Sequence, residues 1–330
     1  MTQVQVQHKR KKSVTSTREY YKPFDYPEAY KFYQTSESMH WLADEVPMHQ
    51  DILDWKNKLT ETEKNFLTQI FRFFVQADVD VAGAYATKYL PMFKLPEIRM
   101  MLLSFGAREA IHIQAYSHLI DTIGMPETTY KQFHEYAEMR EKHEYFDQFM
   151  GTDASQIVQQ MAAFSAFTEG LALFSSFIML LNFTRFNKMN GMGQIIAWSI
   201  KDESVHVEGM TWLFKEFLKE HRDIWTDELK AQLYSIAEKM VELEDKFIDL
   251  AFSTGGVEGL TIEEVKRYIR YIADRRLIGL GMKGIFKVKT NPLPWVEDIL
   301  NAPEHANFFE QKATAYSKGS LTGSWGKVWK

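Results

Sequence analysis

The residues of this chain that are best suited to chemistry are carboxylates and histidines at regular intervals. Glutamate and histidine occur twice at the spacing Glu-x-x-His, and a single carboxylate precedes the two pairs by 31 and 34 residues. A Glu and a His three residues apart project from one helix face, and four carboxylates with two imidazoles can hold two iron or manganese ions inside a helix bundle. The candidate ligands are Asp78, Glu109, His112, Glu169, Glu203 and His206.

A chain with 44 acidic residues and 10 histidines will also contain this spacing by chance. Glu37 and His40 have it, but they lie in an aromatic segment without the apolar periodicity of a long helix. We interpret them as a surface or capping pair. The paired arrangement, rather than any single motif, therefore indicates a two-metal site.

Apolar residues recur with helical periodicity along most of the chain, and the alternation typical of strands is almost absent. Capping boxes at Thr60-x-x-Glu63 and Thr261-x-x-Glu264 indicate two helix starts. We therefore predict an all-α helical bundle. The predicted helices span residues 61–89, 96–122, 127–146, 154–184, 191–220, 227–252 and 262–278. We further predict an irregular N-terminal segment over residues 1–50, a helical dimetal domain over 51–285 and an extended tail over 286–330.

Hairpin geometry tests whether the first candidate ligands can meet. Pro91 and Pro96 break the chain around the midpoint between Asp78 and Glu109. In an antiparallel hairpin these two carboxylates would stand at one height, about 23 Å from the turn. Asp80 is a rival to Asp78, but it points to a different helix face, and only one of them can face the core. We predict Asp78, because its height matches that of Glu109.

The second hairpin fits less closely. The midpoint between Glu169 and Glu203 is residue 186, whereas the turn-forming residues are centred a few positions later, around Asn190. The mismatch is about one helical turn, which a distorted helix near Glu169 could absorb. Apolar residues surround the candidate ligands, and buried carboxylates are costly unless they bind cations or carry protons.

Composition excludes several classes of function. The net charge of −5 gives no reason to expect nucleic-acid binding, and the basic run at residues 8–12 is typical of a solvated tail. The absence of cysteine excludes disulfides, zinc-thiolate sites and thiol chemistry on this chain. The most apolar stretch, residues 170–184, is shorter than the roughly 20 residues that a membrane span needs. Because the first residues also lack an apolar signal core, we expect a soluble cytoplasmic protein.

Tyr116 follows Glu109 by seven residues and His112 by four, so all three lie on one helix face. A buried helical tyrosine usually packs in the core. Beside an oxygen-activating metal pair, it is instead a candidate for one-electron oxidation.

Together these residues resemble the small, radical-generating subunit of class I ribonucleotide reductase. The resemblance rests on Asp78, on Glu169, on Glu109-x-x-His112-x-x-x-Tyr116 and on Asp202-Glu203-x-x-His206. It extends from about Trp41 through Asn291-Pro292-Leu293-Pro294-Trp295, and so covers most of the chain.

The resemblance implies a ferritin-like helical bundle with additional helices and an extended C-terminal tail. It also implies a dinuclear centre of iron or manganese (Fe/Fe, Mn/Mn or mixed) that reacts with an oxygen species and stores an oxidising equivalent, classically as a radical on Tyr116. That equivalent would pass to a large catalytic subunit, where a cysteine starts the reduction of ribonucleotides to deoxyribonucleotides. In this family Trp41, Asp202 and Tyr316 would lie on the radical-transfer route, with Asp202 also contacting His112. A homodimer is expected.

Two other functions remain open from the residues alone. A ferritin-like dimetal oxidase or hydroxylase would act on its own substrate, with Tyr116 as an ordinary pocket residue. Metal storage would require only a shorter chain of four helices. The sequence does not identify the metals or the oxidant, and it leaves open whether Tyr116 or the metals hold the oxidising equivalent. The basic, tryptophan-bearing end at residues 323–330 also differs from the acidic tails of many family members.

Overall fold

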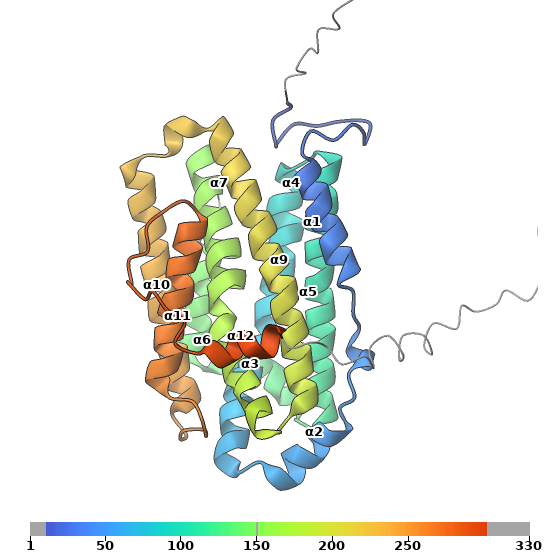
Figure 1. Ribbon diagram of the computed structural model, residues 1–330, viewed down its shortest axis with the longest axis vertical. Helices are drawn as coiled ribbons and strands as arrows, with labels where there is room; N and C mark the ends of the chain where they lie inside the picture. Colours follow the sequence, from blue (N-terminus) through green and yellow to red (C-terminus); the bar gives the residue numbers. More distant parts are fainter. Residues whose placement is uncertain (1–10, 150, 302–330) are drawn as a thin grey trace, which may run out of the picture.

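The computed structural model describes residues 11–149 and 151–301 of the 330-residue chain. Within these ranges the chain forms helices joined by connecting segments, and no β-strand. Figure 1 shows most of the helices running side by side along the long axis of the molecule. The predicted all-α fold is therefore confirmed.

Among the described residues, four long helical runs contribute the side chains of the site. They are α3 (Glu61–Ala84), α5 (Pro96–Thr122), a composite run of α7 (Ala154–Met161), a π-helix (Ala162–Ala172) and α8 (Phe174–Leu181), and α9 (Asn190–Glu220). The other α-helices pack around these or connect them. They are α1 (Pro27–Ser38), α2 (His49–Leu53), α4 (Leu90–Met92), α6 (Ala137–Asp147), α10 (Asp227–Phe252), α11 (Ile262–Gly279) and α12 (Pro294–Asn301).

Two of these helices begin with the predicted capping boxes. At the start of α3, Glu63 N donates to Thr60 Oγ1 at 3.2 Å, and Thr60 N donates to Glu63 Oε2 at 2.8 Å. Thr261 and Glu264 form the same reciprocal pair at the start of α11. These bonds satisfy N–H groups that the first turn of a helix leaves unpaired.

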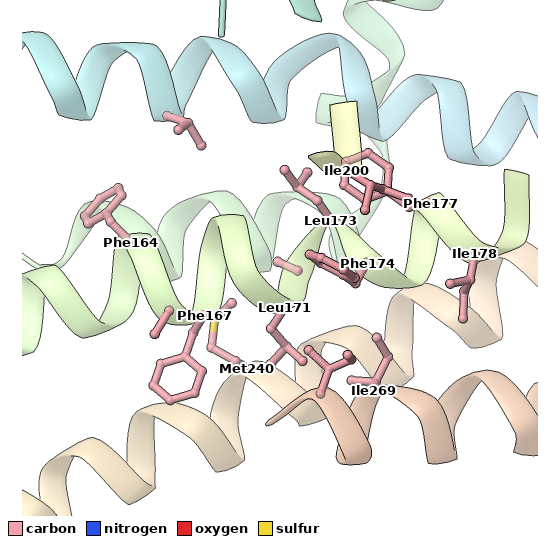
Figure 2. Packing of buried hydrophobic residues seen from close by; sticks show 14 of the residues in the cluster. Phe164, Phe167, Leu171, Leu173, Phe174, Phe177, Ile178, Ile200, Met240 and Ile269 are labelled. Carbon is pink, nitrogen blue, oxygen red and sulfur yellow. The ribbon is translucent and has the colours of Figure 1, made fainter. Parts of the chain in front are cut away.

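The composite run over residues 154–186 passes through the apolar core. Figure 2 shows Leu171 beside Ile269 of α11, and Phe167 on the side that faces Met240 of α10. By length and composition this run could cross a membrane, so the prediction that no apolar stretch reaches that length was wrong. The apolar stretch extends past Glu169 towards the N-terminus, because one buried acid does not interrupt it. Its most apolar window is wholly buried inside the protein, as expected of a core helix in a soluble protein.

Helices occur at both ends where none was predicted. Residues 27–38, predicted to be irregular, form α1, which packs against α5 and α9. Its N-cap residue makes no side-chain capping bond, and Ser36 accepts a hydrogen bond at 2.8 Å from Ser104 of α5. Pro27 in the first turn is a local start signal, and packing on α5 and α9 stabilises α1 further. Residues 294–301 form α12, within the predicted extended tail. The domain limits at residues 50 and 285 stay predictions.

Candidate metal centre

The six candidate ligands meet inside the bundle, although they come from four separate helical runs. Asp78 lies on α3, one Glu-x-x-His pair on α5, Glu169 in the π-helix and the other pair on α9. They form two groups, and Glu109 belongs to both. Within each group the potential ligand atoms all lie within 4.8 Å of one another. All six are 1% exposed or less: Asp78, Glu109, His112, Glu169, Glu203 and His206.

Glu109 and Glu203 each face both imidazoles. Glu109 Oε1 lies 2.9 Å from His206 Nδ1, and its Oε2 lies 3.5 Å from His112 Nδ1. Glu203 Oε1 lies 3.3 Å from His112 Nδ1, and its Oε2 lies 3.5 Å from His206 Nδ1. Each of these two carboxylates therefore lies between the two imidazoles.

The remaining two carboxylates each lie beside one imidazole. Asp78 Oδ2 is 4.0 Å from His112 Nδ1, and Glu169 Oε1 is 3.7 Å from His206 Nδ1. The cluster thus divides into two halves, each with one imidazole and one carboxylate of its own. The equal heights that were predicted for Asp78 and Glu109 are consistent with their meeting in one group.

The donor atoms of the cluster fit a pair of cations. Within the described residues, no hydrogen-bond partner is found for either oxygen of Asp78, and the oxygens of Glu109 and Glu203 lie against the imidazoles of the cluster without hydrogen-bond geometry. Buried polar atoms normally have hydrogen-bond partners. A set of lone-pair donors without such partners is suited to binding a cation. Carboxylate oxygens and imidazole nitrogens are ligands for iron and manganese. The residues present therefore fit a dinuclear metal centre.

The pKa values of the carboxylates reflect crowding of negative charge. Burial, with a neighbouring carboxylate, raises the pKa of Asp78 well above its ordinary value. Burial raises the pKa of Glu169 to about 7. Burial would also raise the pKa of Glu203, but the adjacent imidazoles of His112 and His206 outweigh it and lower this pKa to about 2. Two divalent cations would relieve the same crowding.

A chain of contacts leads from His112 away from the cluster. His112 Nε2 lies 3.2 Å from Asp202 Oδ2, and Trp41 Nε1 donates to the same oxygen at 2.8 Å. The Trp41 ring also stacks on the His112 ring, with centroids 5.9 Å apart and planes 25° apart. Asp202 favours a proton on Nε2 of His112, which leaves Nδ1 directed at the cluster. The predicted contact of Asp202 with His112 is present.

Tyr116 is buried on α5, one turn beyond His112, and is 3% exposed. The centroids of the two rings are 6.3 Å apart. Burial, and then the charge of Asp78, raise the pKa of the Tyr116 phenol well above its ordinary value. The phenol is therefore protonated at neutral pH and lies close to one half of the cluster.

Glu169 lies in a distorted helix, of the kind that could absorb the mismatch in the second hairpin. A π-helix has more residues per turn than an α-helix, so the segment Ala162–Ala172 rotates Glu169 about the axis relative to a regular helix. Arg276 Nε of α11 donates to the carbonyl of Gly170 at 2.7 Å. A Cβ at Gly170 would lie 2.7 Å from that nitrogen, so glycine permits the close approach.

A lysine side chain holds the C-terminal end of the π-helix. Lys142 Nζ of α6 donates to the carbonyl of Ala172 at 3.3 Å. Lys142 is fully buried and also forms an ion pair with Glu244 of α10, which in turn accepts a hydrogen bond from Ser175. Side chains from two neighbouring helices therefore hold the main chain on the C-terminal side of Glu169, and Glu244 of α10 holds one of these side chains in place.

Comparison with known proteins now identifies the family. A family model described as ribonucleotide reductase, small chain, matches residues 18–292. The matched region contains the whole cluster, together with Trp41, Tyr116 and Asp202. The chain belongs to this family. The predicted resemblance to the small subunit of class I ribonucleotide reductase is therefore confirmed, as is the prediction of an oxidoreductase subunit.

Two viral members of the family are similar over nearly their full length. The chain is 47% identical to a probable ribonucleoside-diphosphate reductase small subunit of Invertebrate iridescent virus 6, over 96% of this chain and 99% of the relative. It is 50% identical to the corresponding probable small subunit of Invertebrate iridescent virus 3, over 92% of this chain and 86% of the relative.

Solved structures of the family share the fold. The ribonucleotide reductase R2 subunit of Clostridium botulinum has a TM-score of 0.78 at 23% identity, over 83% of this chain and 88% of its own. The dimanganese(II) NrdF of Streptococcus sanguinis has a TM-score of 0.75 at 21% identity, over 85% of this chain and all of its own. The predicted ferritin-like bundle is confirmed, and so is a cluster suited to a dinuclear metal site. As a ribonucleotide reductase small chain, the protein has a large subunit as its partner.

Asp80 and the pair Glu37 and His40, which share the sequence features of the candidate ligands, lie outside the cluster. Asp80 is partly exposed and pairs with His143, whereas Asp78 faces the other ligands. Glu37 and His40 are exposed, and they contact α5 through Ser104 and Arg108 respectively. Their interpretation as a surface pair therefore agrees with their positions.

Tyr316 and the basic segment 323–330 lie outside the described residues, so the tail part of the predicted radical route is not placed. Tyr85, by contrast, is a site residue that sequence reasoning missed. Its hydroxyl donates to Glu169 Oε1 at 2.7 Å. Tyr85 follows Asp78 by seven residues, the same interval that separates Tyr116 from Glu109, and that interval was the available signal.

Proposed function

We propose that this small chain stores an oxidising equivalent beside a dinuclear metal centre and passes it to a large subunit that reduces ribonucleotides to deoxyribonucleotides. One observation carries the proposal. The buried cluster adjoins the buried phenol of Tyr116, and it is also connected to Trp41, whose indole donates to the Asp202 carboxylate that contacts His112. A storage protein or a purely structural bundle has no need for that combination.

The ligand roles follow the two halves of the cluster. Iron and manganese both suit the donor set, and the bound pair would supply one-electron oxidising power after reaction with an oxygen species. Glu109 and Glu203 would contribute an oxygen to each ion. The residues that would hold one ion only are Asp78 and His112 in one half, and Glu169 and His206 in the other.

Tyr116 is the proposed carrier of the radical. Its phenol would lose one electron to the oxidised centre and its proton to the adjoining Asp78 carboxylate, and its burial would shield the resulting neutral radical from solvent. The route away from the centre would run through His112 and Asp202 to Trp41, which are in direct contact. We propose that Tyr316 continues this route in the tail, where it would meet the large subunit.

Reconstitution tests this function. The purified, metal-loaded chain mixed with a cysteine-containing large subunit is expected to form deoxyribonucleotides, whereas neither chain alone should do so. The expectation follows from the absence of cysteine here, because the thiol must come from the partner. Oxidation of some other substrate by this chain alone would instead favour a dimetal oxidase or hydroxylase.

We further propose that the protein is a homodimer through the outer face of α5. Leu103 is 55% exposed, and Ala107, Ala110 and Gln114 continue an exposed, largely apolar stripe along the helix. Exposed apolar faces of this kind support association, and in this family the expected partner surface is a second copy.

Replacing Leu103 with arginine is expected to shift the protein from dimer to monomer in analytical ultracentrifugation, because a charge would be buried in the interface. Ile278→Arg on α11 is the matched control, since Ile278 is also 55% exposed. Unchanged dimerisation of the Leu103 variant, or equal loss in both variants, would rule out this face.

The soluble helical fold and the absence of cysteine support a cytoplasmic location. We also propose that the tail over residues 286–330 docks on the large subunit, as the resemblance to this family implies.

A further inference from the structure

Tyr85 has nearly the same relation to one half of the cluster that Tyr116 has to the other. The ring of Tyr116 lies 6.3 Å from that of His112, and the ring of Tyr85 lies 6.1 Å from that of His206. The two imidazole rings are themselves 6.4 Å apart. Each half of the cluster therefore has its own buried phenol.

The Tyr85 side chain makes a direct contact with a candidate ligand. Its hydroxyl donates to Glu169 Oε1 at 2.7 Å, the same oxygen that lies 3.7 Å from His206 Nδ1. Tyr85 is 2% exposed, and the rings of Tyr89 and Phe105 lie 5.7 and 6.1 Å from its own. A phenol packed in this way is a rigid donor that water does not replace.

The position of Glu169 is also fixed by hydrogen bonds to the main chain that follows it. The carbonyls of Gly170 and Ala172 accept hydrogen bonds from Arg276 and Lys142, at 2.7 and 3.3 Å. With the helix fixed, the remaining freedom of Glu169 is rotation about its side-chain torsions. The bond from Tyr85 restricts that rotation, because it fixes the position of Oε1.

We propose that Tyr85 is a positioning residue that orients Glu169 as a ligand of the second metal ion, in the half of the cluster that contains His206. This inference rests on the proposed dinuclear centre and adds to it a residue that acts through a ligand. A hydrogen bond to a ligating carboxylate sets which oxygen faces the ion, and loss of such a partner typically costs about 10- to 100-fold in metal affinity.

Metal titration of the full-length protein tests the proposal. Mn²⁺ is added to the metal-free wild type and to Tyr85→Phe, and free Mn²⁺ is measured by electron paramagnetic resonance (EPR). The wild type is expected to bind two ions. Tyr85→Phe is expected to bind the first ion normally and the second about 10- to 100-fold more weakly.

Two further variants separate positioning from packing. Tyr89→Phe is the matched control, because Tyr89 is buried in the same π-helical turn (Tyr85–Tyr89) and its hydroxyl donates to the main-chain carbonyl of Gln160 at 3.4 Å rather than to a candidate ligand. It should bind both ions as the wild type does. 4-Aminophenylalanine at position 85 restores a donor of similar reach and should restore binding of the second ion.

The outcomes distinguish this inference from the function on which it rests. Two ions bound by the wild type with unchanged affinity in Tyr85→Phe would overturn the positioning role alone. Equal weakening in Tyr85→Phe and Tyr89→Phe would also overturn it, since packing would then explain both. Fewer than two ions bound by the wild type would contradict the dinuclear centre itself.

Discussion

Glu109→Ala is expected to abolish the binding of both metal ions, and with it all ribonucleotide reduction. Glu109 is the residue that belongs to both ligand groups, and its two oxygens lie 2.9 and 3.5 Å from different imidazoles. Its loss removes an oxygen donor from each ion at once. Metal analysis of the purified variant should find at most traces of iron or manganese.

Thermal unfolding provides a second readout of the Glu109 variant. A ligand that binds only the folded state stabilises it by about 2.7 kcal/mol at 100 times its Kd. Added metal should therefore raise the Tm of the wild type but not that of Glu109→Ala. Glu37→Ala is the matched control, because Glu37 has the same Glu-x-x-His spacing on the surface. Two ions retained by Glu109→Ala would contradict the bridging position.

The second large effect is expected at Trp41. Trp41→Phe keeps an aromatic ring over His112 but removes the N–H group that donates to Asp202 at 2.8 Å. The variant should bind both metal ions and form the oxidised centre, yet its ribonucleotide reduction with the large subunit should fall to background. The reason is that the substitution interrupts the radical-transfer route between the oxidised centre and the large subunit.

EPR separates transfer from storage in the Trp41 variant. Oxygen-exposed Trp41→Phe should retain the narrow organic radical signal of the wild type, whereas Tyr116→Phe should lose it. Trp212→Phe is the control, since Trp212 packs on Tyr26 and Phe32 instead. Wild-type reduction by Trp41→Phe would refute the route. A multiline metal signal unaffected by Tyr116→Phe would place the oxidising equivalent on the metals.

The ligand set could be predicted because it depends on short-range spacing. Glu109 and His112 are three residues apart on one helix, so any helix that buries one of them also presents the other to the same site. The height of Asp78 followed from the two prolines that delimit the hairpin. Asp80 differs by only two residues, and its partly exposed position shows how strongly the helical period separates two acids.

The π-helix and Tyr85 depend on contacts that local sequence does not encode. The carbonyls of the distorted segment are held by Arg276 and Lys142 from distant parts of the chain. Tyr85 meets Glu169 across 84 residues of sequence. Helix α1 (Pro27–Ser38) was missed although it begins with a proline, because its packing on α5 and α9 joins distant parts of the sequence.

The central claim is that one buried cluster holds two metal ions, and element-specific anomalous diffraction from metal-loaded crystals tests it most directly. Data collected on both sides of the iron and manganese absorption edges would also identify each ion. Two peaks are predicted, both adjoining Glu109 and Glu203, with Asp78 and His112 at one and Glu169 and His206 at the other. A single peak, no peak, or peaks away from these six residues would contradict the account.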